Sequence, residues 1–320
     1  MPIWFCPGIL IMKTVQPAVN VLAFINLARL RIVGMVLVTC ALGYVLSYRG
    51  DFDWLVFNCA LLGTALLSAG SCSLNCYIER DKDALMPRTS NRPIPAGVIK
   101  PPVACAYGAL LIVSGFAVLL TSVNVLAAIL GLSAAIIYLA LYTPLKQITW
   151  LNTSIGAIPG AIPPLIGWAA ARGQLDFGGW ILFAMLFIWQ HTHFFPIAWM
   201  YRKDYKEAGF RMLPALEAEG TNTFRLTVLT AIILLPVSFL LYADGFAGPT
   251  YCIAALLSGT LLLTEGVRLA LKPSYAAAQR VLRVSLIYLP VILAAVMIDR
   301  YCAQVSSHLQ AWLGTVWRWS

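Results

Sequence analysis

Nine apolar segments follow one another along this chain, each about as long as the roughly 20 residues that a helix needs to cross a bilayer. Charged residues make up only 11% of the sequence, against about 25% in soluble domains, which excludes a soluble globular enzyme. The basic residues are scattered between the apolar segments, which excludes a nucleic-acid-binding protein. The sequence predicts an all-α integral membrane protein with nine transmembrane helices, near residues 30–48, 54–76, 102–121, 123–142, 152–170, 179–200, 224–242, 248–270 and 283–299.

The distribution of lysine and arginine predicts the orientation of these helices. Basic residues favour cytoplasmic loops, and an N-terminus placed inside puts 18 of the 22 on the cytoplasmic side. We therefore expect both an N-in, C-out topology and the nine-span count, because a miscounted span would scramble the alternation. The four residues left outside are Arg49, Arg172, Arg300 and Arg318.

The topology divides the chain into three parts. We expect an N-terminal cytoplasmic segment at residues 1–28, a transmembrane domain at 29–300 and a C-terminal tail at 301–320. The apolar stretch before Lys13 is short and broken by prolines, so it resembles neither a signal peptide nor a span. No Arg- and Ser-rich transit peptide precedes the first span, which favours a bacterial inner membrane over a mitochondrial one.

Two long polar loops follow the second and sixth spans, at about residues 73–93 and 201–214. Four spans separate them, so both emerge on the same, cytoplasmic side, as in a parallel internal duplication. One interpretation is that long inner loops are charged only because they are wet. The spacing of the acidic residues favours a binding site instead.

In the first loop, Asn75, Glu79 and Asp83 are spaced four residues apart, which places three oxygen-bearing side chains on one face of a helix continuing from the second span. Hard oxygen ligands of this kind suit Mg²⁺ together with substrate phosphate oxygens. Arg88 and Arg92, with Lys82, are close enough in sequence to bind the remaining phosphate charge. The loop predicts a site for a diphosphate whose tail lies in the membrane.

Two further acids leave alternatives open. Asp81 either binds a second metal ion in an unwound segment or pairs with Arg80 or Lys82. In the second loop, Asp204 either completes a second Mg²⁺ site across a cleft or belongs, with Glu207, to a solvated surface helix. Two cations would balance a diphosphate and stabilise its departure from an allylic carbocation.

Two of the three histidines, His191 and His193, lie within the sixth span, where an ionisable group is a functional candidate. The alternative for each is a hydrogen bond to a neighbouring helix. The fifth predicted span, 152–170, contains Gly156, Gly160 and three prolines, which predict a kink that serves either helix packing or a cavity wall.

These motifs resemble the intramembrane aromatic prenyltransferases of the UbiA superfamily over about residues 29–300. The first acidic motif of that superfamily, N-x-x-x-D-x-x-x-D, is matched by Asn75, Glu79 and Asp83, with glutamate in place of the usual aspartate. The segments Tyr142–Lys146, Trp189–Phe194 and Tyr201–Tyr205 are similar to the branch that farnesylates heme. A second motif elsewhere in the superfamily, D-x-x-x-D, is incomplete here, because Ala208 stands four residues after Asp204.

The resemblance implies a UbiA-type helical bundle that transfers the farnesyl group of farnesyl diphosphate to a vinyl group of heme b, a substrate, to give heme O. It implies Mg²⁺ held by Asn75, Glu79, Asp83 and Asp204, with Asp81 as a further candidate, and histidines His193 and His191 that orient heme. The implied phosphate partners are Arg88, Arg92, Lys146, Arg202 and Lys203. The implied partners are the lipid bilayer, heme A synthase and oxidase assembly proteins.

Two other functions compete with this one. A second kind of UbiA enzyme prenylates a hydroxybenzoate or naphthoate for quinone synthesis, and the acidic loops alone do not separate it from the heme branch. A secondary transporter also has parallel repeats and proline-broken helices. It would carry charged groups along a path through the middle of the membrane, whereas the acids here gather at one face.

Overall fold

The computed structural model describes residues 21–217 and 219–316 of the chain. Nine helical segments in this part are long and apolar enough to span a membrane, which confirms the predicted count and makes the chain a multi-pass membrane protein. No strand occurs among the described residues. The spans are α2 (Leu30–Ser47), α3 (Trp54–Ile78), α5 (Pro101–Ser122), α6 (Val125–Ile136) with η1 (Ile137–Tyr142) and α7 (Thr143–Leu145), α8 (Asn152–Ala161) with α9 (Pro163–Arg172), α10 (Phe177–Met200), α13 (Thr221–Ala243), α14 (Pro249–Leu271) and α15 (Tyr275–Val316).

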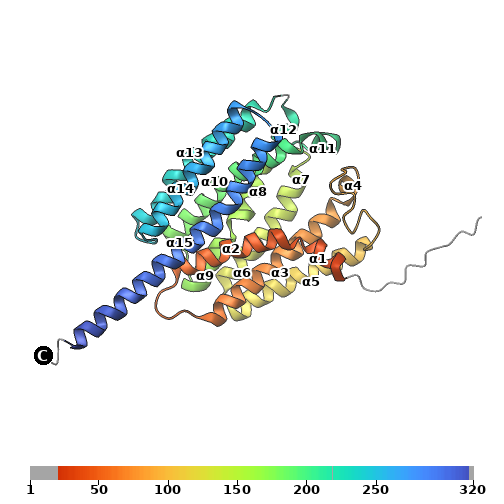
Figure 1. Ribbon diagram of the computed structural model, residues 1–320. Coiled ribbons are helices and arrows are strands. Elements are labelled where there is room, and N and C mark those ends of the chain that lie inside the picture. Colours follow the sequence, from red (N-terminus) through yellow and green to blue (C-terminus); the bar gives the residue numbers. More distant parts are fainter. Residues whose placement is uncertain (1–20, 218, 317–320) are drawn as a thin grey trace, which may run out of the picture.

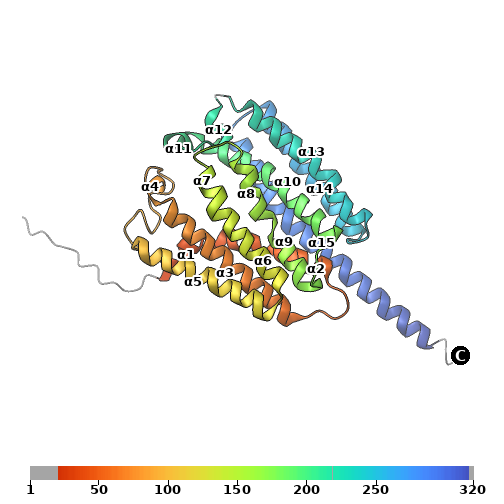
Figure 2. The same ribbon diagram turned by 180° about the vertical axis from the view of Figure 1, so that it is seen from behind.

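Four short helices complete the fold: α1 (Val21–Ala28), α4 (Arg80–Asp83), α11 (Arg202–Glu207) and α12 (Leu213–Leu216). Figures 1 and 2 place α4, α7, α11 and α12 at the same end of the bundle. Of the expected N-terminal segment 1–28, residues 1–20 lie outside the described residues, and so do the predictions made for them; the remainder forms α1.

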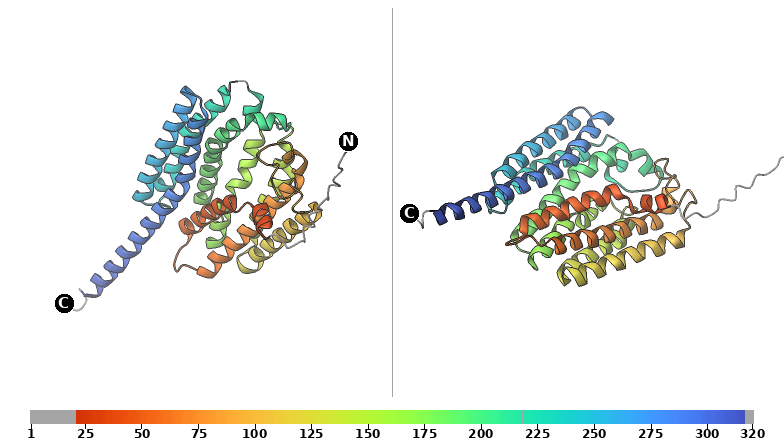
Figure 3. Two further views of the ribbon diagram at one scale, coloured as in Figure 1. Left: turned by 45° about the vertical axis from the view of Figure 1, so that its right-hand side comes forward. Right: turned by 60° about the horizontal axis from the view of Figure 1, so that its bottom comes forward.

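The spanning helices form a ring with an outer layer. α2 packs on α3, α9 and α15, α8 packs on α10 and η1, and α10 packs on α15, so the ring closes on itself. α5 lies outside α3, and α13 and α14 lie outside α10 and α15 (Figure 3). This arrangement leaves a space inside the ring that reaches the end carrying the short helices.

Glycines allow two helix pairs, one of them within the ring, to approach closely. A Cβ added at Gly70 of α3 would lie 2.7 Å from the carbonyl oxygen of Gly108 in α5. A Cβ added at Gly167 of α9 would lie 1.9 Å from the carbonyl oxygen of Cys40 in α2. Backbones this close need residues without side chains, as is common between membrane helices.

The fifth span is broken as its prolines predict. Pro163 has no amide hydrogen to continue the helix, and the chain turns at Ile162 between α8 and α9. The break serves both of the purposes considered, since Gly156, Pro159 and Pro163 line the central cavity while Gly167 packs on α2.

The last helix is longer than predicted, at 42 residues. It begins at Tyr275 rather than 283, because Ser274 caps it through a 3.1 Å bond from the amide of Ala277, and it continues through residues expected as a tail. At the far end from the short helices, Asp299 accepts hydrogen bonds from the amides of Thr250 and Tyr251 at the start of α14. This contact fixes α15 to its neighbour.

Candidate functional site

A cavity of about 530 Å³ lies within the ring of helices, a volume typical of small-molecule sites. Its walls come from α2, α3, α6, η1, α8, α9, α10 and α15, and residues of the two polar loops lie at its mouth. Among the described residues, the lining includes five bases and two acids, an excess of three positive charges. They are Arg29, Arg31, Arg88, Arg92 and Lys146, with Glu79 and Asp83.

The first polar loop continues the second span with a small break. α3 ends at Ile78, and the amide of Glu79 still donates to the carbonyl of Asn75 at 2.9 Å. The short helix α4 then brings the amide of Asp83 to the carbonyl of Glu79 at 2.8 Å. All three side chains are buried, although two are acids, so their environment must compensate them.

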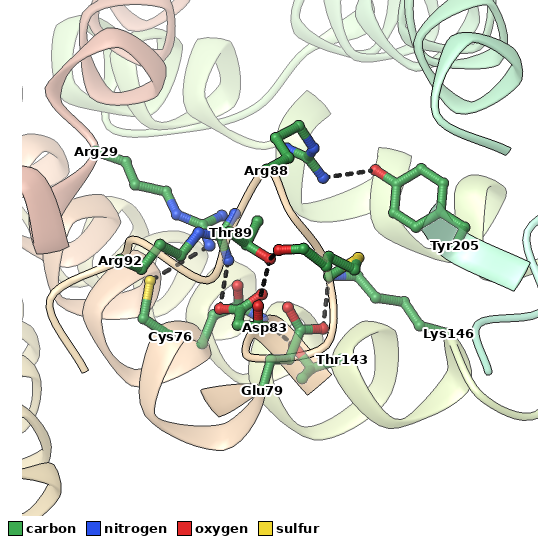
Figure 4. A network of polar contacts seen from close by, with 12 residues as sticks. Arg29, Cys76, Glu79, Asp83, Arg88, Thr89, Arg92, Thr143, Lys146 and Tyr205 are labelled. Atoms are coloured by element: carbon green, nitrogen blue, oxygen red, sulfur yellow. Dashed lines mark hydrogen bonds and ion pairs between the residues drawn. The ribbon is translucent and has the colours of Figure 1, made fainter. Parts of the chain in front are cut away.

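Two cations from different elements compensate the acids (Figure 4). Lys146, which follows α7, donates from Nζ to Glu79 Oε1 at 2.7 Å. Arg92 donates from Nη1 to Asp83 Oδ2 at 2.5 Å. Each carboxylate therefore has a basic partner that was predicted to bind phosphate.

The third side chain of the motif is incompletely bonded. Asn75 is fully buried, and its Nδ2 donates to Oγ1 of Thr143 at 3.1 Å. Its Oδ1 has no hydrogen-bond partner in the described part of the chain. Because an unpaired buried acceptor costs free energy, this oxygen is a candidate ligand for a cation. Together with the two carboxylates, it forms a donor set of hard oxygens that fits Mg²⁺.

Burial and nearby charges shift the pKa of two of these groups. Burial raises the pKa of Asp83 above its ordinary value, although the guanidinium of Arg92 opposes the shift. Burial lowers the pKa of Lys146, but its interactions with Tyr142 and Glu79 outweigh this, so the net pKa is raised. Lys146 therefore stays charged at neutral pH.

Arg29 is a site residue that the sequence analysis used only as a topology marker. It has φ 53°, a left-handed conformation that is uncommon for residues other than glycine, and it separates α1 from α2. It lines the cavity, and its Nη2 donates to Sγ of Cys76 at 3.3 Å (Figure 4). An arginine before the first span was the only signal in the sequence, because the left-handed turn that directs it into the cavity has no sequence pattern.

The two polar loops meet over the mouth of the cavity, as their predicted common side requires. Met86 of the first loop packs in a buried cluster with Ala208, Phe210 and Met212 of the second. The guanidinium of Arg88 lies 4.8 Å from the ring centre of Tyr201. Its Nη2 donates to the hydroxyl of Tyr205 at 3.4 Å (Figure 4).

Besides Asn75, several predicted site residues do not line the cavity: Asp81, Lys82, His191, Arg202, Lys203 and Asp204. Asp81 is solvent-exposed and pairs with Arg80 at 3.7 Å, which corresponds to the ion-pair interpretation. Asp204 is half-buried and does not line the cavity, because the next residue of α11, Tyr205, is turned toward it. Arg202 stacks on Trp199 at 4.4 Å, and Lys203 is exposed.

The two histidines of α10 have different surroundings. His193 lines the cavity, stacks on Trp189 with ring centres 5.0 Å apart, and bonds through Nδ1 to Oγ of Ser285 at 2.8 Å. The Ser285 hydroxyl donates to the carbonyl of Leu282, so Nδ1 of His193 must donate and Nε2 keeps its lone pair. His191 is instead held between helices, by Oγ of Ser154 at 2.9 Å and the carbonyl of Phe187 at 2.8 Å.

Comparison with known proteins gives the family and the fold. Residues 36–289 match the UbiA prenyltransferase family. The chain is 42% identical to "Protoheme IX farnesyltransferase" of Solibacter usitatus, over 87% of this chain and 98% of that protein. It is 41% identical to the protein of the same name from Koribacter versatilis, over 78% of this chain and 82% of that protein.

Solved structures share the fold at low sequence identity. A digeranylgeranylglyceryl phosphate synthase has a TM-score of 0.72 and 18% identity, covering 87% of this chain and 98% of that one. A UbiA homologue from Archaeoglobus fulgidus, bound to DMAPP and Mg²⁺, has a TM-score of 0.66 and 15% identity, covering 86% and 99%. The all-helical fold is therefore shared well beyond the sequence relatives.

Proposed function

The chain belongs to the UbiA prenyltransferase family, and we propose that it transfers the farnesyl group of farnesyl diphosphate to a vinyl group of protoheme IX, giving heme O. The observation that carries this proposal is a cavity whose cationic mouth holds two buried carboxylates, above a mainly apolar interior. The buried, unpaired amide oxygen of Asn75 belongs to the turn of helix just before the first of these carboxylates. The names of the relatives support the same donor and acceptor. Membership of this family disfavours the transporter alternative.

We assign the metal-binding role to Asn75, Glu79 and Asp83, which supply one amide and two carboxylate oxygens. When bound, Mg²⁺ supplies positive charge that favours departure of the diphosphate. The family neighbour solved with DMAPP and Mg²⁺ supports divalent metal use in this fold. The positions of Asp81 and Asp204 give no support for a second metal ion at this mouth.

We assign the diphosphate-binding role to Arg29, Arg88, Arg92 and Lys146, whose side chains all line the cavity. Lys146 and Arg92 pair with the two carboxylates, so binding of a metal ion by these acids would free both bases for the diphosphate. The excess of three positive charges at the lining suits a group that carries up to three negative ones. The basic residues also hold the departed diphosphate away from the allylic cation.

The acceptor is assigned to the deeper part of the cavity, beside His193 and Trp189 on α10. The bond to Ser285 fixes the ring of His193 and leaves Nε2 as an acceptor or ligand for heme. Aromatic side chains in the wall, Tyr138, Trp189 and Phe194 among them, would limit access of water to the allylic cation until the new bond forms. The final hydroxyl comes from water that adds to the farnesylated vinyl group.

We further propose the N-in, C-out orientation in a bacterial inner membrane, with the two loops in the cytoplasm. This orientation places 18 of the 22 lysines and arginines on the cytoplasmic side, where basic residues are favoured. Farnesyl diphosphate then enters from the cytoplasm with its tail in the bilayer. The product would leave within the membrane toward heme A synthase or an oxidase assembly protein.

The test is an acceptor competition with the purified full chain. Farnesyl diphosphate and Mg²⁺ are supplied with heme b, with 4-hydroxybenzoate or with both, and products are separated by mass. We expect a farnesylated, hydrated heme from the first and third mixtures, lost in Asp83→Ala protein that still folds. Prenylation of the benzoate alone would replace the heme assignment by the quinone alternative.

A further inference from the structure

The fourth span contains a turn of π-helix at the wall of the cavity. Across Ile137–Tyr142 the helix widens, and the amide of Thr143 donates to the carbonyl of Tyr138, five residues earlier. The physical cause is Pro144, which has no amide hydrogen and would strike the carbonyl four residues before it in a regular helix. Such single π-turns frequently occur at functional sites.

In this turn the carbonyl of Tyr138 accepts two hydrogen bonds from Thr143, one from its amide and one from its hydroxyl. The hydroxyl oxygen lies 2.8 Å from the carbonyl oxygen. A threonine hydroxyl has a single hydrogen, so Oγ1 can only accept from any further neighbour. That neighbour is Asn75, 68 residues away in sequence, whose amide contacts Oγ1 at 3.1 Å.

The direction of this chain of bonds determines which way the amide of Asn75 faces. If the amide were reversed, its Oδ1 would face a lone pair of Oγ1, and neither atom could donate. Nδ2 must therefore face Thr143, which leaves Oδ1 as the unpaired acceptor. Both residues are buried, at 0% and 2% exposure, so water does not compete for these bonds.

We propose that Thr143 is a positioning residue for the cation site: its hydroxyl holds the amide of Asn75 so that Oδ1, rather than the NH₂ group, is presented to a divalent ion. This inference rests on the proposed function of Asn75, Glu79 and Asp83. Without the hydroxyl, the amide is free to turn its NH₂ group toward the carboxylates, which would satisfy the acids internally and oppose a cation. Partners that orient metal ligands in this way commonly change metal affinity by about 10- to 100-fold.

The variants that isolate this role differ by one hydroxyl. Thr143→Val removes it and keeps the side-chain shape, whereas Thr143→Ser keeps the hydroxyl. The matched control is Thr227→Val in α13, because Thr227 is also fully buried and its hydroxyl also donates to a backbone carbonyl, that of Thr223 at 2.8 Å. Asp83→Asn tests the proposed site itself.

The measurement is binding of Mn²⁺ to the full chain in detergent, followed by electron paramagnetic resonance, first with Mn²⁺ alone and then with Mn²⁺ and farnesyl diphosphate. We expect Thr143→Val to bind Mn²⁺ about tenfold more weakly, while Thr143→Ser and Thr227→Val stay within twofold of the unmodified protein. Thermal unfolding without metal checks that each variant is folded, and Thr143→Ala replaces Thr143→Val if the latter does not accumulate.

The outcomes separate the two proposals. If the unmodified protein binds no Mn²⁺, or if Asp83→Asn binds Mn²⁺ as tightly as the unmodified protein does, the metal site is refuted. The positioning role of Thr143 is then refuted with it. If Asp83→Asn weakens Mn²⁺ binding but Thr143→Val does not, only the positioning role is refuted. Equal losses in Thr143→Val and Thr143→Ser would also overturn it, because they would reflect packing rather than the hydroxyl.

Discussion

The buried pair between Glu79 and Lys146 gives a quantitative test of charge compensation in the site. The side chains are only 6% and 12% exposed, and Nζ lies 2.7 Å from Oε1. Glu79→Met removes the carboxylate, keeps a similar volume and leaves Lys146 as a buried charge without its partner. Breaking a buried pair in this way typically costs about 3–5 kcal/mol.

The proton on Lys146 sets an upper limit for this cost. A buried lysine without a partner can lose its proton and become neutral. For an amine with an ordinary pKa of about 10.4, deprotonation at pH 7 costs about 4.6 kcal/mol. We therefore expect Glu79→Met to lower the free energy of unfolding by about 3 to 4.6 kcal/mol. For a chain of this length, this corresponds to a fall in melting temperature on the order of 5 °C.

Thermal unfolding in detergent, without metal, measures this effect. Farnesyl diphosphate should recover part of the lost melting temperature in Glu79→Met, because its phosphates give Lys146 a new partner. The double variant Glu79→Met with Lys146→Met should also recover it, since replacing both charges by apolar groups is often neutral. Asp81→Asn, which alters an exposed pair, should change stability by less than about 0.5 kcal/mol. If the double variant is as unstable as Glu79→Met, an unpaired lysine is not the cause, and the reasoning is refuted.

Three further predictions concern the mouth and the wall of the cavity. Arg29→Asn removes the guanidinium but keeps a residue that tolerates the left-handed backbone. It should weaken binding of farnesyl diphosphate by about tenfold, as measured by calorimetry. Unchanged affinity would exclude Arg29 from the diphosphate site. Gly160→Ala would place a methyl group 1.9 Å from Oε1 of Gln190 and should lower the free energy of unfolding by about 1–3 kcal/mol. Gly34→Ala, where the added methyl group meets no other atom, should raise the melting temperature slightly. Equal changes in melting temperature for the two variants would contradict the close packing at Gly160. The guanidinium of Arg92 lowers the pKa of Asp83, so Arg92→Gln should let this carboxyl protonate at a higher pH. Mn²⁺ binding, measured during acidification, should therefore be lost at a higher pH than in the unmodified protein. Loss at an unchanged or lower pH would contradict this prediction.

Much of the fold was predictable because a bilayer imposes strong rules on sequence. Spans of about 20 apolar residues gave the nine helices, and proline chemistry gave the break at Ile162. The common side of the two polar loops followed from counting spans, and the contact of Met86 with Phe210 and Met212 agrees with it. The sequence did not give the start of the last span, because Arg280 and Arg283 made its first turns resemble a loop.

The site was predictable where spacing along one helix decides it, and not where distant elements decide it. The interval of four residues sets Asn75, Glu79 and Asp83 on successive helical turns, and it brings both carboxylates to the mouth. The same reasoning could not show that α11 turns Tyr205, rather than Asp204, toward the cavity. It also missed Arg29, whose direction depends on a single left-handed residue between two helices.

The glutamate that replaces the usual aspartate in the first motif has a physical role in the ligand-free site. Glu79 lies at the end of α3, while its partner Lys146 follows the π-turn and α7 on another span. One methylene fewer would shorten the reach of the carboxylate by about 1.5 Å, which is enough to break the 2.7 Å contact unless the helices move. Glu79→Asp should therefore lower stability in the ligand-free protein, yet keep Mn²⁺ binding, because the shorter carboxylate is what most of the superfamily motif carries. A variant that loses Mn²⁺ binding but keeps its melting temperature would reverse this assignment, and would mean that the extra length serves the metal ion rather than the lysine.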